Sequence, residues 1–324
     1  MTCLFDSWQR QINYLRISVT DHCNLNCSYC SARSVPRLPR NEILSYEELE
    51  RVVRIASGMG INKLRLTGGE PLLRPGITKL VSMLSRVEGI DDVSLTTNGI
   101  LLADFAKELK KAGLHRVNVS LDTLRADRYK SITGGKLETV LSGIEAAHLA
   151  GLVPVKINMV VLRGVNDDEV IDFARKTIKQ EWHVRFIEFM PFGASRNGNS
   201  ETVPTKEIRE KIQTLGRLEP YTGKSGNGPA RYYRLLGAKG TIGFISPMTE
   251  HFCSTCNRLR LTADGHLRPC LLDDDEINIK TALRNGASDA ELERLIQQAV
   301  IIKREGHNLN QGIAPVKPMS QIGG

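Results

Sequence analysis

The chain has 324 residues, of which 41% are hydrophobic and 25% are charged, the balance of an ordinary globular protein. This length suits one large α/β domain with an appendage. The N-terminal residues have no apolar run of signal-peptide length and no run approaches a membrane span, so we expect a cytoplasmic protein without a membrane partner. The net charge of +8 invites nucleic-acid binding, but the positive charges are spread along the chain, which argues against a nucleic-acid partner.

Six short β-type segments follow one another, each with a turn and a helix-like stretch behind it. The helix expected at 45–60 has the clearest pattern, because Ser45 can cap it and Gly58 and Gly60 can end it. Strands that alternate with helices indicate βαβ units and a parallel sheet. Six units predict an incomplete (β/α)6 TIM-type barrel, since a closed barrel needs eight. The expected strands are 15–20, 63–69, 93–99, 117–122, 154–161 and 184–191.

Apolar and polar residues alternate within these strands. Successive side chains of a strand point to opposite faces, so helices should cover the apolar face and leave the polar face inside the barrel. The polar set contains five cations with little acid to balance them: Arg16, Lys63, Arg65, Lys156 and Arg185. Solvated strand faces with salt bridges to helices are the alternative. Because unpaired buried cations are costly, we interpret the pattern as a wide cationic lumen for a polyanion such as a triphosphate.

Three cysteines lie within eight positions near the N-terminus: Cys23, Cys27 and Cys30. A structural zinc site uses four ligands, whereas an iron-sulfur cube held by three cysteines leaves one iron free to bind something that is not protein. His22 is a possible fourth ligand, although it points the other way in an extended chain. Disulfides are disfavoured, because seven cysteines is an odd count and a chain of this size can bury a large core without them.

After about residue 216 the alternation stops and a glycine-rich region begins, so we expect a barrel domain at 1–215 and a separate region at 216–324. This region contains a second cysteine triplet: Cys253, Cys256 and Cys270. With a turn at 264–265, the triplet resembles half a zinc ribbon that is one ligand short. His251 or His266 could complete a zinc site. Cys3 is left over as an ordinary thiol.

The first triplet, with Tyr29 before its last cysteine, resembles the signature of the radical S-adenosylmethionine (AdoMet) superfamily. The sequence "GGEP" at 68–71 resembles the methionine-binding motif of the same superfamily. With "LTTNG", "NVSLDT", "RFIEFMP", "FCSTCNRLRL" and the terminal "GG", nearly the whole chain resembles the GTP 3',8-cyclase family of molybdenum cofactor biosynthesis.

That resemblance implies a radical AdoMet enzyme that cyclises GTP, the first step of molybdopterin biosynthesis. It implies two [4Fe-4S] clusters and AdoMet as cofactors, and a C-terminal extension that closes the open side of the barrel. The implied chemistry is an electron transfer that cleaves AdoMet to a 5'-deoxyadenosyl radical, which takes the 3' hydrogen of GTP before the sugar closes onto C8 of guanine. No residue is required as a general acid or base. The cofactors carry the difficult chemistry and the protein orients the reactants.

The resemblance also assigns residue roles by motif position. The implied ligands of the first cluster are Cys23, Cys27 and Cys30, and those of the second are Cys253, Cys256 and Cys270. The implied AdoMet contacts are Tyr29, Gly69, Ser120 and Met190. The implied GTP contacts are Arg16, Lys63, Arg65, Thr96, Lys156, Arg185, Arg258 and Arg260. The free iron of the second cluster would touch guanine, and the C-terminal glycine would lie beside the last two arginines. Core packing is the alternative for Met190, and cluster shielding is the alternative for Tyr29.

Three kinds of protein partner are implied: an electron donor of the flavodoxin or ferredoxin type, cyclic pyranopterin monophosphate synthase as the next enzyme, and a second copy of the chain in a homodimer. Two other readings stay open. A radical AdoMet enzyme acting on a peptide would be expected to have more than three C-terminal cysteines. A zinc- or cluster-bearing nucleic-acid module would be expected to cluster its basic residues with aromatics, which form only 5% of this chain.

Overall fold

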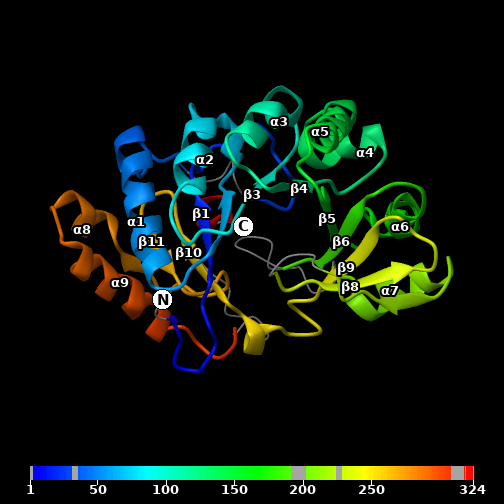
Figure 1. The fold of residues 1–324 in the computed structure, drawn as a ribbon. Helices are drawn as coiled ribbons and strands as arrows, with labels where there is room; N and C mark the ends of the chain where they lie inside the picture. Colours follow the sequence, from blue (N-terminus) through cyan, green and yellow to red (C-terminus); the bar gives the residue numbers. More distant parts are fainter. Residues whose placement is uncertain are drawn as a thin grey trace. The chain divides into compact units, whose positions relative to one another are not determined.

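The computed structural model of the chain describes residues 3–30, 36–190, 202–223, 228–307, 317 and 319–323 (Figure 1). Two compact units contain these residues. Unit 1 takes Met1–Thr96, Glu108–His115 and Cys253–Gly324, and unit 2 takes Thr97–Lys107 and Arg116–Phe252. The beginning and the end of the chain therefore belong to the same unit. The domain boundary predicted at 215 and 216 rests on the end of the strand alternation and the start of a glycine-rich region, and it stays a prediction.

Unit 1 contains a sheet with the strand order β12-β11-β10-β1-β2-β3. Its strands are β1 (Tyr14–Ser18), β2 (Lys63–Thr67), β3 (Asp92–Thr97), β10 (Arg258–Leu261), β11 (His266–Arg268) and β12 (Ile277–Asn278). The strands β10, β1, β2 and β3 run parallel, and β11 and β12 are antiparallel to their neighbours. A strand from the end of the chain thus pairs directly with the first strand.

The helices of unit 1 are α1 (Tyr46–Gly58), α2 (Ile77–Ser85), α8 (Lys280–Arg284), α9 (Asp289–Ile301) and α10 (Met319–Ile322). Its 3-10 turns are η1 (Arg40–Glu42), η2 (Pro71–Leu73) and η5 (Cys253–Thr255). Helix α1 begins with a capping box in which Ser45 and Glu48 satisfy each other's backbone N–H groups, as its sequence predicts. Helix α9 lies beside α1 (Figure 1), and Arg51 on α1 pairs with Asp289 on α9 at 2.8 Å.

Unit 2 contains a sheet with the strand order β4-β5-β6-β9-β8-β7, in which β4, β5, β6 and β9 are parallel. Its strands are β4 (Arg116–Ser120), β5 (Lys156–Val161), β6 (His183–Glu188), β7 (Leu218–Pro220), β8 (Arg231–Leu235) and β9 (Thr241–Ile245). Its helices are α4 (Ala126–Thr133), α5 (Leu137–Leu149), α6 (Val170–Lys179) and α7 (Thr205–Gln213), with the 3-10 turn η3 (Asp167–Glu169). Helix α3 (Leu102–Lys111) is divided between the two units.

All six expected strands are present, three in each unit, so the predicted βα repeats are confirmed. The predicted alternation is also present: Leu15 and Ile17 on β1 are fully buried, whereas Arg16 between them is partly exposed. The sequence did not predict β9, nor did it predict that β10, the strand after Cys256, pairs with β1; these two strands extend the parallel part of each sheet. The strand β9 has a glycine at its centre, and β10 is only four residues long. None of the described helices is both long enough and apolar enough to span a membrane.

Candidate active site

The register of three strands gathers predicted GTP contacts in unit 1. The first strand, β1, pairs in parallel with β2 on one side and with β10 on the other, so the three strands share rows of opposed residues. One row consists of Arg65, Arg16 and Arg260. The neighbouring row consists of Lys63, Tyr14 and Arg258. Because residues two apart on a strand point to the same face, both rows lie on one face of the sheet and carry five cations.

These arginines destabilise one another's positive charge. Burial, followed by the charges of Arg260 and Arg65, lowers the pKa of Arg16 well below its usual range. Burial and the charge of Arg258 likewise lower the pKa of Arg260. Among the described residues, Arg65 donates to the Ser94 hydroxyl at 3.3 Å and stacks over a tyrosine ring, and it has no carboxylate partner. A bound polyanion would relieve this repulsion, which supports the cationic lumen inferred from the sequence.

The described end of the C-terminal tail reaches the same arginine row. Helix α10 ends at Ile322, and the Gly323 carbonyl accepts a hydrogen bond of 2.7 Å from Nη1 of Arg260. Gly323 has φ = +73°, and a Cβ atom there would lie 2.5 Å from Oγ1 of Thr67 and 3.0 Å from Cβ of Ser18. Only glycine fits this position without strain or a clash. Gly324, predicted to lie beside the arginines, is outside the described residues.

The first cysteine triplet lies in a loop directly after β1. Its three cysteines form no disulfide and are half-buried, the Cys30 N–H bonds the Cys27 carbonyl at 3.0 Å, and the Leu25 N–H points at Sγ of Cys23 at 3.5 Å. Tyr29 is also half-buried in this loop. Backbone N–H groups aimed at sulfur are a feature of iron-sulfur sites, where they help to set the reduction potential.

Gly69 holds this cysteine loop against β2. Its N–H bonds the Thr20 carbonyl at 2.8 Å, and the N–H of Glu70 bonds the His22 carbonyl at 2.6 Å. A Cβ atom on Gly69 would lie 2.3 Å from that His22 oxygen, a contact that backbone atoms cannot relieve. The predicted role of Gly69 was close approach to AdoMet. The structure adds a second reason for glycine, because the residue packs onto the segment that leads into Cys23.

The second triplet is arranged as the sequence predicts: a short turn, η5, then β10, then a turn in which Gly265 has φ = +79°, and β11 before the third thiol. Burial raises the pKa of Cys253, and the negative charges of Cys270 and Cys256 raise it further, so the three sulfurs interact. Burial also raises the pKa of Cys256, but the charges of Arg258 and Lys303 outweigh burial and lower it to about 6. Nη2 of Arg258 lies 3.6 Å from Sγ of Cys256.

Both triplets fit iron-sulfur clusters better than zinc. No three His, Cys, Asp or Glu side chains in the described ranges are grouped closely enough to hold a single metal ion. A [4Fe-4S] cluster does not require such a group, because each thiolate binds a different iron. The zinc alternative also lacks its fourth ligand, since the ring of His266 lies between Asp264 at 3.2 Å and Glu276 at 3.8 Å. Cysteines outside any disulfide, cationic neighbours and N–H groups aimed at sulfur therefore suit the clusters.

Unit 2 carries the other four predicted contacts. Lys156, at the start of β5, is 2% exposed, with its Nζ atom 5.4 Å from the centre of the Tyr232 ring. Burial, with further contributions from Arg185 and Arg116, lowers the pKa of Lys156 to about 8. Arg185 donates to Oδ1 of Asn118 at 2.5 Å. Ser120 ends β4, and Met190 follows β6 by two residues; both are half-buried.

Thr96, the remaining predicted GTP contact, lies on β3 in unit 1. Its Oγ1 atom is buried and has no hydrogen-bond partner among the described residues. A buried hydroxyl without a partner is unfavourable, so a ligand that bonds it would stabilise the site.

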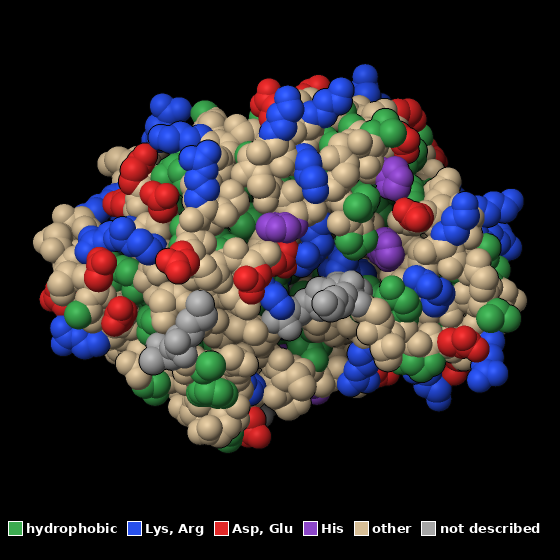
Figure 2. Space-filling view, viewed as in Figure 1, with side chains coloured by type: hydrophobic (Ala, Val, Ile, Leu, Met, Phe, Trp, Pro, Cys, Tyr) green, Lys and Arg blue, Asp and Glu red, His purple; other side chains and the backbone are tan. Residues whose placement is uncertain are grey.

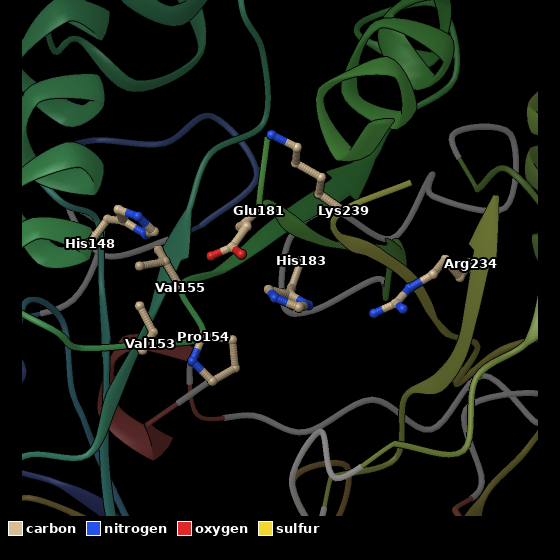
Figure 3. Close-up of a pocket in the computed structure, with 8 residues that line it drawn as sticks. All are labelled: His148, Val153, Pro154, Val155, Glu181, His183, Arg234 and Lys239. Carbon is tan, nitrogen blue, oxygen red and sulfur yellow. The ribbon is translucent and has the colours of Figure 1, made fainter. Parts of the chain in front are cut away.

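A pocket of about 330 Å³ opens near the amino ends of the unit 2 strands (Figure 3). The side chains of His148, His183 and Arg234 surround it, and Glu181 is the acidic residue that lines it. His183 lies opposite Lys156 in the sheet register. No sequence motif indicates this pocket, because its lining comes from the end of α5, from the start of β6, from β8 and from loops.

His183 is expected to make stability depend on pH. Burial, followed by the charges of Lys156 and Arg234, lowers the pKa of His183 to about 4. The unfolded chain then binds a proton below pH 6.5 that the folded chain does not, so stability falls as the pH drops from 6.5 toward 4. At pH 5 the loss is about 2 kcal/mol. We expect His183→Gln to remove this loss, measured by urea unfolding at pH 7 and pH 5. An equal loss for wild type and variant would contradict the assignment.

The surface shows no segregation of charge on the side displayed in Figure 2. Lys and Arg side chains alternate there with Asp and Glu side chains around the periphery. This agrees with the spread of positive charge along the sequence.

Comparison with known proteins places these features in a family. The Radical SAM superfamily model matches residues 17–177, and the Molybdenum Cofactor Synthesis C model matches residues 182–309. Among solved structures, Streptococcus suis SuiB bound to S-adenosylmethionine is similar with a TM-score of 0.63 and 15% identity, over 89% of this chain and 68% of SuiB. Native anSMEcpe with bound AdoMet is similar with a TM-score of 0.57 and 17% identity, over 93% of this chain and 82% of that one.

The fold is therefore the incomplete TIM-type barrel of radical SAM enzymes. Two curated relatives narrow the class. A GTP 3',8-cyclase of Pelotomaculum thermopropionicum is 54% identical over 98% of this chain and 99% of its own length, and one of Moorella thermoacetica is 51% identical over the same shares. The chain belongs to the GTP 3',8-cyclase family.

Proposed function

We propose that this chain is a radical AdoMet enzyme that cyclises GTP to (8S)-3',8-cyclo-7,8-dihydroguanosine 5'-triphosphate, the first step of molybdopterin biosynthesis. The observation that carries the proposal is the row Arg65, Arg16 and Arg260, in a chain with two cysteine triplets and full-length relatives named GTP 3',8-cyclase. A triphosphate would supply the negative charge that this row of arginines lacks. No general acid or base is assigned.

The cysteines of the two triplets would each hold a [4Fe-4S] cluster. When bound, the first cluster and AdoMet supply a 5'-deoxyadenosyl radical that takes the 3' hydrogen of GTP. Tyr29, in the first cysteine loop, would contact AdoMet, and motif position assigns the same role to Ser120 and Met190; all three residues are half-buried. Gly69 keeps the first cysteine loop against β2 through its bond to Thr20, so it supports the cluster and the AdoMet site together.

The cations would bind and orient GTP. Charge-assisted contacts from Arg16, Lys63 and Arg65 would hold the phosphates and fix the ribose, and motif position assigns further GTP contacts to Lys156 and Arg185. Arg258 lies beside the second triplet, and Arg260 is held by the Gly323 carbonyl. These two arginines would therefore act on guanine near the second cluster. Binding that fixes both ends of GTP would favour ring closure, because reacting atoms held in place lose little further entropy.

The wider setting is also proposed. AdoMet cleavage consumes one electron, which supports a flavodoxin- or ferredoxin-type donor. Family membership supports cyclic pyranopterin monophosphate synthase as the next enzyme, a homodimer and a cytoplasmic location.

Anaerobic turnover tests the function. Reconstituted protein with AdoMet, dithionite and GTP should yield 5'-deoxyadenosine and a GTP isomer of unchanged mass, detected by liquid chromatography with mass spectrometry. About eight irons per chain are expected, four for each cube. If AdoMet is cleaved and a peptide is modified while GTP stays unchanged, the peptide-modifying alternative would replace this proposal.

The arginine row is expected to act mainly on GTP binding. A charge-assisted contact contributes about 1.5–3 kcal/mol, so Arg65→Ala should weaken GTP binding about tenfold or more while AdoMet affinity barely changes. Arg54→Ala is a matched control in unit 1, because the Arg54 side chain is 65% exposed on α1. Isothermal titration with GTP and with guanosine separates the contribution of the phosphates to binding from that of the nucleoside. An equal loss for both ligands would show that Arg65 does not contact the phosphates.

A further inference from the structure

Lys303 is a buried cation that the proposed mechanism does not use. It follows α9, it is 3% exposed, and its Nζ atom donates to the carbonyls of Arg258, at 3.1 Å, and Pro269. No carboxylate in the described part of the chain pairs with it. A buried ammonium group without a counter-ion is strongly unfavourable, so this position calls for a nearby negative charge, which no carboxylate of the described residues provides.

The two carbonyls bonded by Lys303 belong to the two segments that carry the second triplet. Arg258 follows Cys256 by two residues, and Pro269 immediately precedes Cys270. The ammonium group therefore bridges the segments on either side of the β10 and β11 hairpin. It fixes the separation of their backbones where the thiols emerge.

Arg10 provides a contrast in the same region. Its guanidinium donates to the carbonyls of Cys253 at 2.7 Å, Arg304 at 2.6 Å and Glu305 at 2.8 Å. Unlike Lys303, it also forms a buried ion pair of 2.6 Å with Asp6. Arg10 is thus a structural contact with its charge neutralised, whereas the charge of Lys303 lowers the pKa of Cys256 in the triplet.

We propose that Lys303 is a positioning residue of the second iron-sulfur cluster: it clamps the Cys256 and Cys270 segments, and its charge is the buried counter-charge that raises the reduction potential of the cluster. This rests on the proposed function of the second triplet. Reduction adds one negative charge to a cluster, and a cation held nearby in a poorly solvated site favours the more negative state. Neighbours beyond the ligands tune a metal centre in this way.

The potential of the second cluster can be measured alone. Replacement of Cys23, Cys27 and Cys30 by alanine leaves one triplet, and the full-length protein is then reconstituted with iron and sulfide. In that background Lys303→Met removes the charge at similar length, and Lys303→Arg keeps it. Lys79→Met is the control, because the Lys79 side chain is 66% exposed. The midpoint potential is read from a redox titration followed by electron paramagnetic resonance, together with iron content.

We expect Lys303→Met to disfavour the reduced cluster about tenfold, a shift of about 59 mV to lower potential for one electron. Lys303→Arg and Lys79→Met should stay near the parent value. If the methionine variant binds no iron while the arginine variant does, the need for the charge is supported through cluster retention. A loaded methionine variant with the parent potential would overturn the proposal. Absence of iron from the triple-alanine parent would instead refute the second cluster itself, a distinct result.

Discussion

Replacing Cys270 by serine is expected to abolish formation of the cyclised product while reductive cleavage of AdoMet continues. Cys270 is the third thiol of the second triplet and follows β11, whereas the first triplet lies in the loop after β1. The two sites draw on separate segments of unit 1, so loss of one thiolate should leave the other cluster intact. Production of 5'-deoxyadenosine and of the GTP isomer, measured in the same anaerobic reaction, tests this division.

Two cysteine variants serve as controls for that experiment. Cys27→Ser should abolish both products, because it removes a ligand of the AdoMet cluster. Cys3→Ser should change neither, since Cys3 is an exposed free thiol outside both triplets. If Cys270→Ser stopped AdoMet cleavage as completely as Cys27→Ser does, the proposed separation of roles would be wrong.

The second large effect is expected at Gly323. A Cβ atom there would clash with Thr67 at 2.5 Å, and φ = +73° is strained for any other residue. Gly323→Ala should therefore displace the tail and break its bond to Arg260. We expect cyclisation to fall about a hundredfold, or about 2.7 kcal/mol, while AdoMet cleavage and both clusters remain. Initial rates of formation of the two products give the comparison.

Gly286→Ala is the matched control for this substitution. Gly286 lies in unit 1 with φ = +78°, but a Cβ atom there would meet nothing within 4 Å. Its alanine variant carries the same kind of backbone strain without a clash at the arginine row. The hypothesis that the tail positions Arg260 fails if Gly323→Ala cyclises GTP at the wild-type rate. It also fails if the two alanine variants lose activity equally.

Much of the fold could be predicted because the signals are local. The helix at Tyr46–Gly58 has its capping serine and its periodic apolar residues within one short window. The six βα strands show period-two alternation over five or six residues each. The parallel pairing of β10 with β1 has no such signal, since strand partners distant in sequence are chosen by tertiary packing.

The residues of the candidate site likewise divide into those that a local sequence pattern predicts and those that it does not. The alternation of β1 and β2 was enough to group Arg16 with Lys63 and Arg65 on one polar face, while Arg258 and Arg260 were assigned only through the family motif. Tyr14 was missed because it precedes the expected strand, although it stands in the same row as Lys63. Lys303 was missed for a different reason. Its contacts are backbone carbonyls, and because every residue has one, the sequence does not indicate which carbonyls a lysine will bond.

The pairing of β1 with β10 also bears on how the chain is made. During synthesis β1 leaves the ribosome early and gains β2 soon afterwards, but its other edge has no partner until Arg258–Leu261 has been translated. An unpaired strand edge is a template for wrong pairing. The nascent chain must therefore keep this strand edge unpaired through most of its translation. The row of three arginines cannot form until the ribosome has translated β10, in the last fifth of the chain.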